Sequence, residues 1–170
     1  MKQRTDQILV GLIAVLAVAL VLVVSGTLEP RIVHAGDRAP NFSITADDGR
    51  TVTRSDFGGK LLVLNFWATW CPPCVEETPS LSRFAAEYAD KGVVVLGVSV
   101  DRDEKAYRKF LDKYQPAFMT VREDKVHADY GTFMYPETYI IDANGKVVEK
   151  FPEEVDWSSP RITKLINSLL

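Results

Sequence analysis

The sequence predicts an α/β domain in which helices cover both faces of a mainly parallel sheet. Two short apolar runs, LLVLNFW (61–67) and VVVLGVSV (93–100), have the length and composition of strands that are buried on both faces. A helical pattern follows each run, over residues 72–91 and from residue 103 to the proline at 116. This alternation of strand and helix is typical of parallel sheets with helical connections.

Shorter elements flank this unit. Residues 42–56 alternate apolar and polar positions around Asp48-Gly49, which predicts an N-terminal hairpin, and residues 138–151 do so around Asn144-Gly145. We also expect a short strand at 118–121, a short helix at 125–130, and a final helix beginning at Pro160. The last hairpin is antiparallel, so the central sheet is predicted to be mixed.

Composition limits the kinds of protein that this chain can be. Its 170 residues suffice for one domain with an appendage, and 46% hydrophobic with 25% charged residues is ordinary for a folded protein. The formal net charge of -3 gives no basic surface for nucleic acid. We therefore expect one folded domain that does not bind DNA or RNA.

The N-terminus carries a hydrophobic segment. Lys2 and Arg4 precede residues 8–24, which contain no polar side chain. An apolar helix of about 20 residues crosses a bilayer, and the basic residues before it place the N-terminus in the cytoplasm. A secretory signal cleaved after Val24-Ser25-Gly26 is the alternative, although the apolar region of such signals is usually shorter. We expect an anchor at 1–28, a tether at 29–38 and an exported domain at 39–170.

The two cysteines of the chain, Cys71 and Cys74, admit three interpretations. A structural zinc site needs four ligands, and the two histidines, His34 and His127, lie far from this pair in the sequence; we expect His127 to be solvated. A structural disulfide closing so short a loop gains little, at the low end of roughly 2 to 4 kcal/mol. The third interpretation is a redox pair.

The position of the pair favours redox chemistry. Cys71 stands where a buried strand ends and a helix begins, and free backbone N–H groups and the helix dipole favour a thiolate there. We expect Cys71 to be the attacking sulfur. Cys74, one helical turn further, is expected to be buried and to act as the resolving thiol that breaks the mixed disulfide.

The two residues between the cysteines suggest the direction of electron flow. Pro72 and Pro73 have no N–H group, so in the first turn only the amide of Cys74 and those beyond it can bond a thiolate at Cys71. Weaker stabilisation of the thiolate makes the couple more reducing. The sequence therefore predicts an electron donor.

Several motifs together resemble a known family. The resemblance is to the thioredoxin fold. It is carried by the strand that leads into the motif NFWATWCPPC (65–74), by the following helix that contains Pro79, and by the segment YPETYIIDANGKVV (135–148). More narrowly, they are similar to the membrane-tethered thiol-disulfide oxidoreductases of the TlpA, ResA and DsbE type, many of which serve cytochrome c maturation. The match covers roughly residues 37–151 and the final helix, and residues 100–130 resemble the helix-strand insertion of that family.

The resemblance implies roles for residues outside the cysteine motif. Pro136 matches a proline that is cis in this fold and faces the cysteines, and the backbone of Tyr135 would pair with an extended substrate peptide. Trp70 would shield the thiolate and offer the substrate an apolar platform. No bound cofactor or metal is implied, because the electrons travel through sulfur.

One difference from cytoplasmic thioredoxins concerns proton transfer. Those proteins carry a buried aspartate where this chain has Asn65, which cannot ionise. Glu77, three residues after Cys74, matches an acidic residue that the tethered family places near the disulfide, although compensation of the helix dipole alone would also explain it. Glu76 is expected to be its exposed neighbour, and Glu137 is a weaker candidate for the same electrostatic role.

The prediction is an enzyme that reduces protein disulfides, anchored by a single span to the bacterial cytoplasmic membrane with its domain on the outer face. An apocytochrome c is the implied type of substrate, and a transmembrane thiol carrier the implied electron donor. Two alternatives stay open. One is a peroxide-reducing enzyme on the same fold, and the other is a module that uses the cysteine pair to handle copper or to dock a partner.

Overall fold

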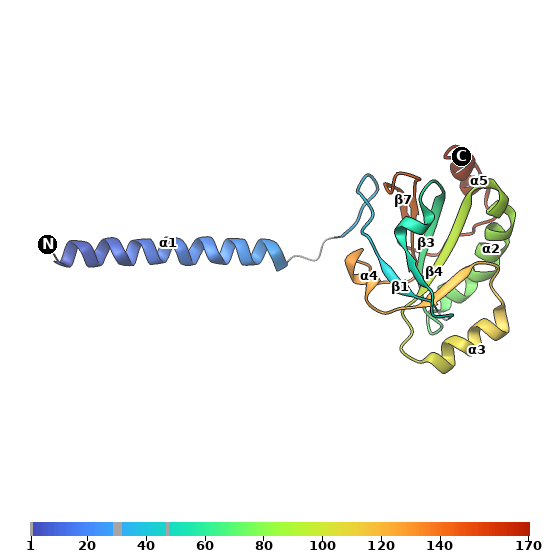
Figure 1. Ribbon diagram of the computed structural model, residues 1–170, viewed down its shortest axis with the longest axis horizontal. Helices are drawn as coiled ribbons and strands as arrows, with labels where there is room; N and C mark the ends of the chain where they lie inside the picture. The colour runs from blue at the N-terminus through green and yellow to red at the C-terminus, as the bar shows by residue number, and fades with distance from the viewer. Residues whose placement is uncertain (1, 29–31, 47) are drawn as a thin grey trace. The chain divides into compact units, whose positions relative to one another are not determined.

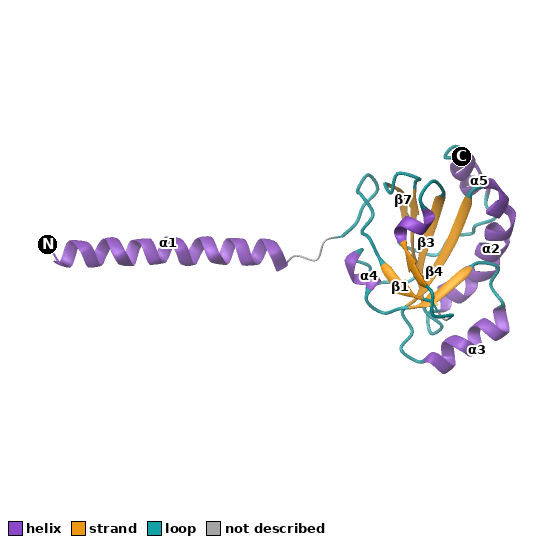
Figure 2. Cartoon of the chain, in the orientation of Figure 1, coloured by secondary structure: helices purple, strands orange, loops and turns teal. Residues whose placement is uncertain are grey.

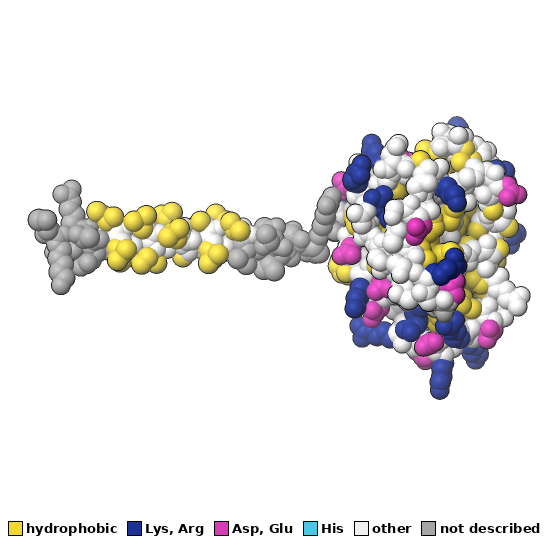
Figure 3. Space-filling view, viewed as in Figure 1, with side chains coloured by type: hydrophobic (Ala, Val, Ile, Leu, Met, Phe, Trp, Pro, Cys, Tyr) yellow, Lys and Arg dark blue, Asp and Glu magenta, His cyan; other side chains and the backbone are white. Residues whose placement is uncertain are grey.

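The computed structural model describes residues 2–28, 32–46 and 48–170, with side chains described from residue 7 to 23 in the first helix. The chain forms two compact units, residues 1–31 and residues 32–170. The first unit contains helix α1 (Lys2–Leu28), whose apolar side chains are exposed between Ile8 and Val23 (Figure 3). Within the described residues, no helix combines the length and hydropathy that crossing a membrane requires.

The second unit begins before residue 39. Residues 29–31 of the expected tether lie outside the described residues, but the chain is packed from Val33 onward. The Val33 side chain is fully buried, and its N–H donates to the Tyr130 carbonyl at 3.0 Å. The Gly36 N–H donates to the Val147 carbonyl at 2.8 Å. The apolar side chain of Val33 thus joins the core of the domain, and the packed unit includes part of the segment expected to be a tether.

A five-stranded mixed sheet forms the centre of this unit, in the order β5-β4-β3-β6-β7 (Figures 1 and 2). The central strand β3 (Leu61–Trp67) runs parallel to β4 (Val93–Ser99), which runs parallel to β5 (Met119–Arg122). On its other side β3 pairs antiparallel with β6 (Glu137–Ile141), which forms a hairpin with β7 (Val147–Phe151). The predicted mixed sheet is confirmed, but it is not mainly parallel, because two of its four strand pairings are parallel and two are antiparallel.

Helices α2 (Pro72–Tyr88) and α5 (Pro160–Asn167) cover one face of the sheet (Figure 1). Their apolar side chains, among them Leu81 and Ile162, form one core cluster with residues of β3 and β4. A short 3-10 turn, Ala89–Lys91, continues α2 and ends at Gly92, where the chain takes a left-handed conformation. This confirms the predicted helix over 72–91 and its glycine stop.

The opposite face is covered by the N-terminal hairpin and a short helix. The hairpin joins β1 (Ser43–Thr45) to β2 (Thr51–Thr53), followed by a 3-10 turn over Arg54–Phe57. Helix α4 (Val126–Asp129) packs into the same core cluster through Val126. Helix α3 (Glu104–Tyr114) instead packs through Tyr107 and Phe110 into a third cluster, which contains both cysteines.

Alternation along β3 determines which side chains reach the cysteines. Leu62, Leu64 and Phe66 point into the core under the hairpin, whereas Leu61 and Val63 point toward α2 and α5. Asn65 belongs to this second set. The strand therefore delivers one polar side chain to the interface between the sheet and α2.

Candidate active site

The two cysteines form a disulfide at the start of α2. Cys71 is the residue that caps the helix, and the S–S distance to Cys74 is 2.14 Å. Cys71 is 4% exposed and Cys74 is 1% exposed. The Cys74 N–H donates to the Cys71 sulfur at 3.3 Å, which is the contact expected of a sulfur held at a helix N-terminus.

The prolines between the cysteines limit this contact to a single amide. Pro72 and Pro73 open the helix and have no N–H. The next amide, that of Val75, donates to the Cys71 carbonyl at 3.2 Å. Among the described residues, the Cys74 amide is therefore the one backbone N–H that donates to the Cys71 sulfur.

The segment before β6 closes over this sulfur. The Tyr135-Pro136 peptide bond is cis, as the resemblance implied. The Cys71 sulfur lies 3.3 Å from the Tyr135 carbonyl oxygen. A disulfide sulfur carries no proton, so this is a contact in the oxidised state, but a reduced Cys71 thiol at this place can donate to the carbonyl.

Exposed apolar side chains lie on both segments that meet at Cys71. Trp70 is 64% exposed, and its ring meets the Tyr135 ring edge-on at 5.9 Å. Phe133 and Met134, which lead into the cis peptide, are 60% and 74% exposed. The sequence analysis did not identify these two residues, although two apolar residues directly before Tyr-Pro were a visible signal. We call Trp70, Phe133 and Met134 the apolar rim.

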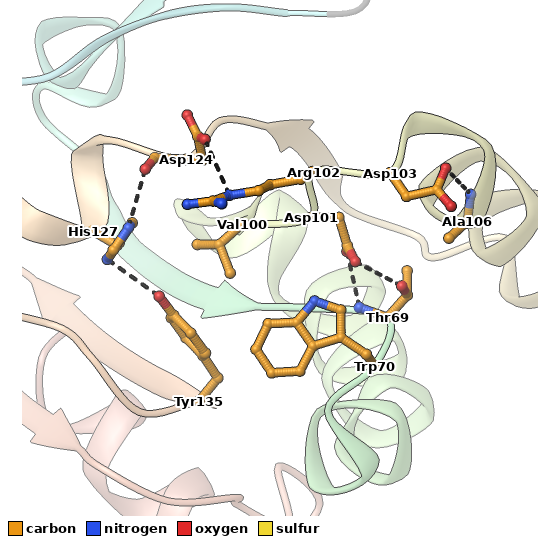
Figure 4. Close-up of a pocket in the computed structure, with 10 residues that line it drawn as sticks. All are labelled: Thr69, Trp70, Val100, Asp101, Arg102, Asp103, Ala106, Asp124, His127 and Tyr135. Carbon is orange, nitrogen blue, oxygen red and sulfur yellow. Dashed lines mark hydrogen bonds and ion pairs between the residues drawn. The ribbon is translucent and has the colours of Figure 1, made fainter.

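A pocket of about 630 Å³ opens beside Trp70 and Tyr135 (Figure 4). His127 lines it and holds Tyr135 in place, because its Nδ1 lies 3.2 Å from the Tyr135 hydroxyl and 2.8 Å from the Thr132 carbonyl. Its Nε2 lies 3.1 Å from the Asp124 carbonyl. The expectation that His127 is merely solvated is wrong, since the ring is half-buried and each of its nitrogens lies within hydrogen-bond distance of a backbone carbonyl.

A buried carboxylate holds the loop before Cys71. Asp101 is 1% exposed and accepts hydrogen bonds from the Thr69 amide at 2.9 Å, the Thr69 hydroxyl at 2.7 Å and the Ser99 hydroxyl at 2.7 Å (Figure 4). Thr69 is two residues before Cys71, so Asp101 fixes the path of the chain into the cysteine motif. The sequence analysis missed Asp101, although a polar residue just after a buried strand is a recognisable signal.

Glu77 is buried between the sheet and α2. It is 4% exposed, and its Oε1 accepts from Asn65 Nδ2 at 2.8 Å while its Oε2 accepts from the Val155 amide at 3.1 Å. Burial raises the pKa of Glu77 to about 7, because loss of water outweighs these two hydrogen bonds. Glu77 follows Cys74 by three residues, so both side chains lie on the buried side of α2. A carboxyl group that ionises near neutral pH thus stands one turn from the inner sulfur.

The other two acidic candidates differ from Glu77. Glu76 is exposed, as expected. Glu137 is buried, but its carboxylate forms an ion pair with Lys150 and accepts from the Tyr139 hydroxyl at 2.9 Å. The charge of Glu137 is therefore compensated within the β6-β7 hairpin.

Among the described residues, no group of three or more His, Cys, Asp or Glu side chains is arranged to hold a metal ion.

Known proteins are similar to this chain in sequence and in structure. The family model described as Redoxin matches residues 34–166. The thioredoxin-like protein YneN of Bacillus subtilis is 40% identical over 118 residues, covering 68% of this chain and 69% of that protein. The thiol-disulfide oxidoreductase ResA of Oceanobacillus iheyensis is 39% identical over 145 residues, covering 81% of this chain and 75% of that protein.

A solved structure agrees with the described fold. A crystal structure of a protein from Chlorobium tepidum, described as a putative thiol:disulfide interchange protein DsbE, superposes with a TM-score of 0.74 at 28% identity, covering 82% of this chain and 99% of that one. The two cysteines of this chain are joined in a disulfide at the start of α2. The chain belongs to the Redoxin family and is a thiol-disulfide oxidoreductase of the ResA and DsbE type with a Cys71–Cys74 pair.

Proposed function

We propose that the protein is a membrane-anchored reductant of disulfides in exported proteins. One observation carries the proposal: the Cys71 sulfur stands at a helix start, 3.3 Å from the Tyr135 carbonyl, where two segments with exposed apolar side chains meet. An extended peptide needs such an apolar surface and backbone groups beside it to pair with. A protein disulfide brought there comes within reach of Cys71.

The reaction has two exchange steps. The Cys71 thiolate attacks one sulfur of the substrate disulfide, breaking that bond and releasing the other substrate sulfur as a thiolate. Cys74 then gives its proton to Glu77 and attacks the Cys71 sulfur, which releases the second substrate sulfur. The substrate gains two electrons and, from solvent, two protons. The domain ends as the Cys71–Cys74 disulfide.

Two features support the reducing direction. With prolines at 72 and 73, the Cys74 amide is the one backbone donor to the Cys71 sulfur among the described residues, so the thiolate is weakly stabilised. Glu77, which ionises near neutral pH, accepts a proton more readily than a carboxylate with an ordinary pKa. Both features favour delivery of electrons from the dithiol to a substrate.

The N-terminal segment supports attachment to the bacterial cytoplasmic membrane with the domain outside. Residues 8–24 have no polar side chain, and Lys2 and Arg4 precede them. The resemblance to the tethered family adds apocytochrome c as a substrate. An exported dithiol is oxidised unless it is supplied with electrons, so we include a transmembrane thiol carrier as the donor.

Trapping with Cys74→Ser in the full chain tests the proposal. Without the resolving thiol, the mixed disulfide on Cys71 persists, and mass spectrometry of the adduct identifies the substrate cysteine. The matched control is Cys71→Ser with Cys74→Ser, which must trap nothing. The proposal fails if Cys74→Ser forms no adduct with exported proteins, or if the reduced chain instead consumes peroxide efficiently or retains copper tightly.

A further inference from the structure

A second pocket lies beside Glu77, and Asn65 is not among the residues that line it. It has a volume of about 240 Å³, and its lining includes Glu77, Glu154, Val155 and Asp156. Glu77 contributes to its wall although the side chain is only 4% exposed. The pocket is therefore the opening in the described structure through which solvent approaches the Glu77 carboxyl group.

The sheet side of Glu77 offers no exit for a proton. Asn65 uses its amide group to donate both to Glu77 and to the Thr138 hydroxyl, at 2.8 Å each. Asn65 and Thr138 are buried, and neither side chain ionises. A proton that Glu77 takes from Cys74 must consequently leave on the other side, past the loop that follows β7.

That loop also contacts Glu77 directly. Its Val155 amide donates to Glu77 Oε2 at 3.1 Å. The Trp157 indole nitrogen is buried and has no hydrogen-bond partner at ordinary distance among the described residues, but it lies close enough to Glu77 to favour the charged carboxylate. The loop thus brings two N–H groups close to Glu77, the Val155 amide and the Trp157 indole. Both stabilise the deprotonated carboxylate.

Several charged groups face Glu77 from the elements around it. Glu76 lies on its own helix, and Glu154 and Asp156 lie on the loop. Hydrogen bonds from the Ser158 hydroxyl and amide lower the pKa of Asp156, with a smaller contribution from Arg83. Asp156 is therefore committed to the charged state through neutral pH. Glu154 is exposed and its charge acts on Glu77.

We infer that this pocket is the proton port of the dithiol: Glu77 exchanges the Cys74 proton with solvent past the Glu154–Asp156 loop, and the charge of Glu154 raises the pH at which that exchange occurs. The inference rests on the proposed role of Glu77 in accepting the Cys74 proton. In the resolving step the Cys74 S–H bond breaks, the proton moves to Glu77, and the sulfur keeps the electron pair that attacks Cys71. Glu77 then releases the proton to water in the pocket. Glu154 is a positioning residue in this scheme and does not contact the sulfurs.

Charge changes at Glu154 test the inference, and Glu153 provides the matched control. Glu153 has the same charge, is exposed, and is outside the pocket lining. The titration midpoint of Glu77 is measured by carboxyl-carbon NMR in the oxidised full chain. We expect Glu154→Gln to lower the midpoint by about 0.3 to 0.5 pH unit, the effect of one partly screened charge, and Glu154→Lys to lower it further. Glu153→Gln and Glu153→Lys should produce a much smaller shift.

A kinetic readout completes the test. The pH profile of the resolving step, measured as release of a thiol from a preformed mixed disulfide on Cys71, should move with the Glu77 midpoint in both Glu154 variants. Equal Glu77 midpoints in the Glu154 and Glu153 variants would overturn the inference. So would a pH profile of the resolving step that stays in place when the Glu77 midpoint shifts. The NMR titration needs no turnover, so failure of the proton-port inference can be told from failure of the proposed function. If only the inference fails, Cys74→Ser still traps substrates. If the proposed function fails, Cys74→Ser traps none.

Discussion

At the scale of single residues, Pro73 controls how many amides can reach the Cys71 sulfur. Replacing it with alanine restores one N–H in the first turn of α2, and replacing it with histidine adds a titratable ring as well. Both changes stabilise the thiolate and so raise the reduction potential. We expect a rise of tens of millivolts, where about 30 mV corresponds to roughly 1.4 kcal/mol, with the larger rise for histidine. Equilibration with glutathione measures it, and an unchanged or lower potential in both variants would contradict the explanation.

Glu77 makes the stability of the oxidised domain depend on pH. The pKa of Glu77 in the folded chain, about 7, lies above the ordinary 4.5, so the folded chain keeps the proton to a higher pH than the unfolded chain does. Stability therefore falls as pH rises from about 4.5 to about 7, by on the order of 3 kcal/mol. In Glu77→Gln this fall should disappear, as measured by denaturant unfolding at pH 5 and pH 8.

The exposed neighbour provides the control for that measurement. Glu76→Gln makes the same chemical change on the same helix, without a buried group. It should keep the pH dependence of the unmodified chain. If Glu77→Gln shows the same fall in stability between pH 5 and pH 8 as Glu76→Gln does, the burial of Glu77 is not the cause.

The residue scale also shows where sequence reasoning succeeded and failed. The cis Tyr135-Pro136 bond and the burial of Cys74 were predictable, the first from the family resemblance and the second from helix geometry. The surroundings of His127 and Glu137 were not, because a pattern of residue types does not show which groups their side chains contact. Their partners are the Thr132 carbonyl, five residues along the chain, and the Lys150 side chain on the neighbouring strand of the hairpin.

At the scale of elements, the end of β4 supports the loop that leads into the cysteine motif. Asp101→Ala would remove the acceptor of three hydrogen bonds, two from Thr69 and one from Ser99. Leaving a buried donor unsatisfied costs about 1 to 3 kcal/mol. Because Thr69 is only half-buried, we expect a loss toward the lower end of the sum for three donors, roughly 3 to 5 kcal/mol in the free energy of unfolding of the oxidised domain.

A smaller change at the same place serves as the comparison. Ser99→Ala removes one of the donors to Asp101 and also the acceptor of the Asp101 amide at 3.1 Å, but it leaves Thr69 bound to Asp101, so it should cost less, about 1 to 2 kcal/mol. Chemical denaturation measures both variants. A loss for Asp101→Ala no larger than that for Ser99→Ala would show that Asp101 does not anchor the loop.

Periodicity made most elements predictable before the structure was known. The apolar runs that became β3 and β4 and the turn signals of both hairpins correspond to observed elements. The start of the packed unit was less predictable, since residues 32–38 have the composition of a linker. They pack because Val33 fits the core and Gly36 and Arg38 pair with residues 146–147, which no local pattern reveals.

At the scale of the whole molecule, the redox groups and the apolar N-terminal helix lie in different units of the chain. Residues 32–170 carry the disulfide, the apolar rim and Glu77, and residues 1–31 carry the apolar helix. All of the described redox groups lie within the larger unit, so its chemistry does not require contacts with α1. The proposed attachment would keep this chemistry at the membrane surface, where a thiol carrier can supply electrons.

The central claim is that Cys71 and Cys74 cycle between disulfide and dithiol at a potential low enough to reduce other protein disulfides. The most direct measurement is the redox equilibrium of the full chain in graded dithiothreitol or glutathione buffers, read by mass spectrometry after alkylation. We predict a single two-electron transition at a potential below about -230 mV, more reducing than most glutaredoxins. A pair that shows no reversible transition, or one above about -180 mV in the range of protein disulfide isomerase, would contradict the account.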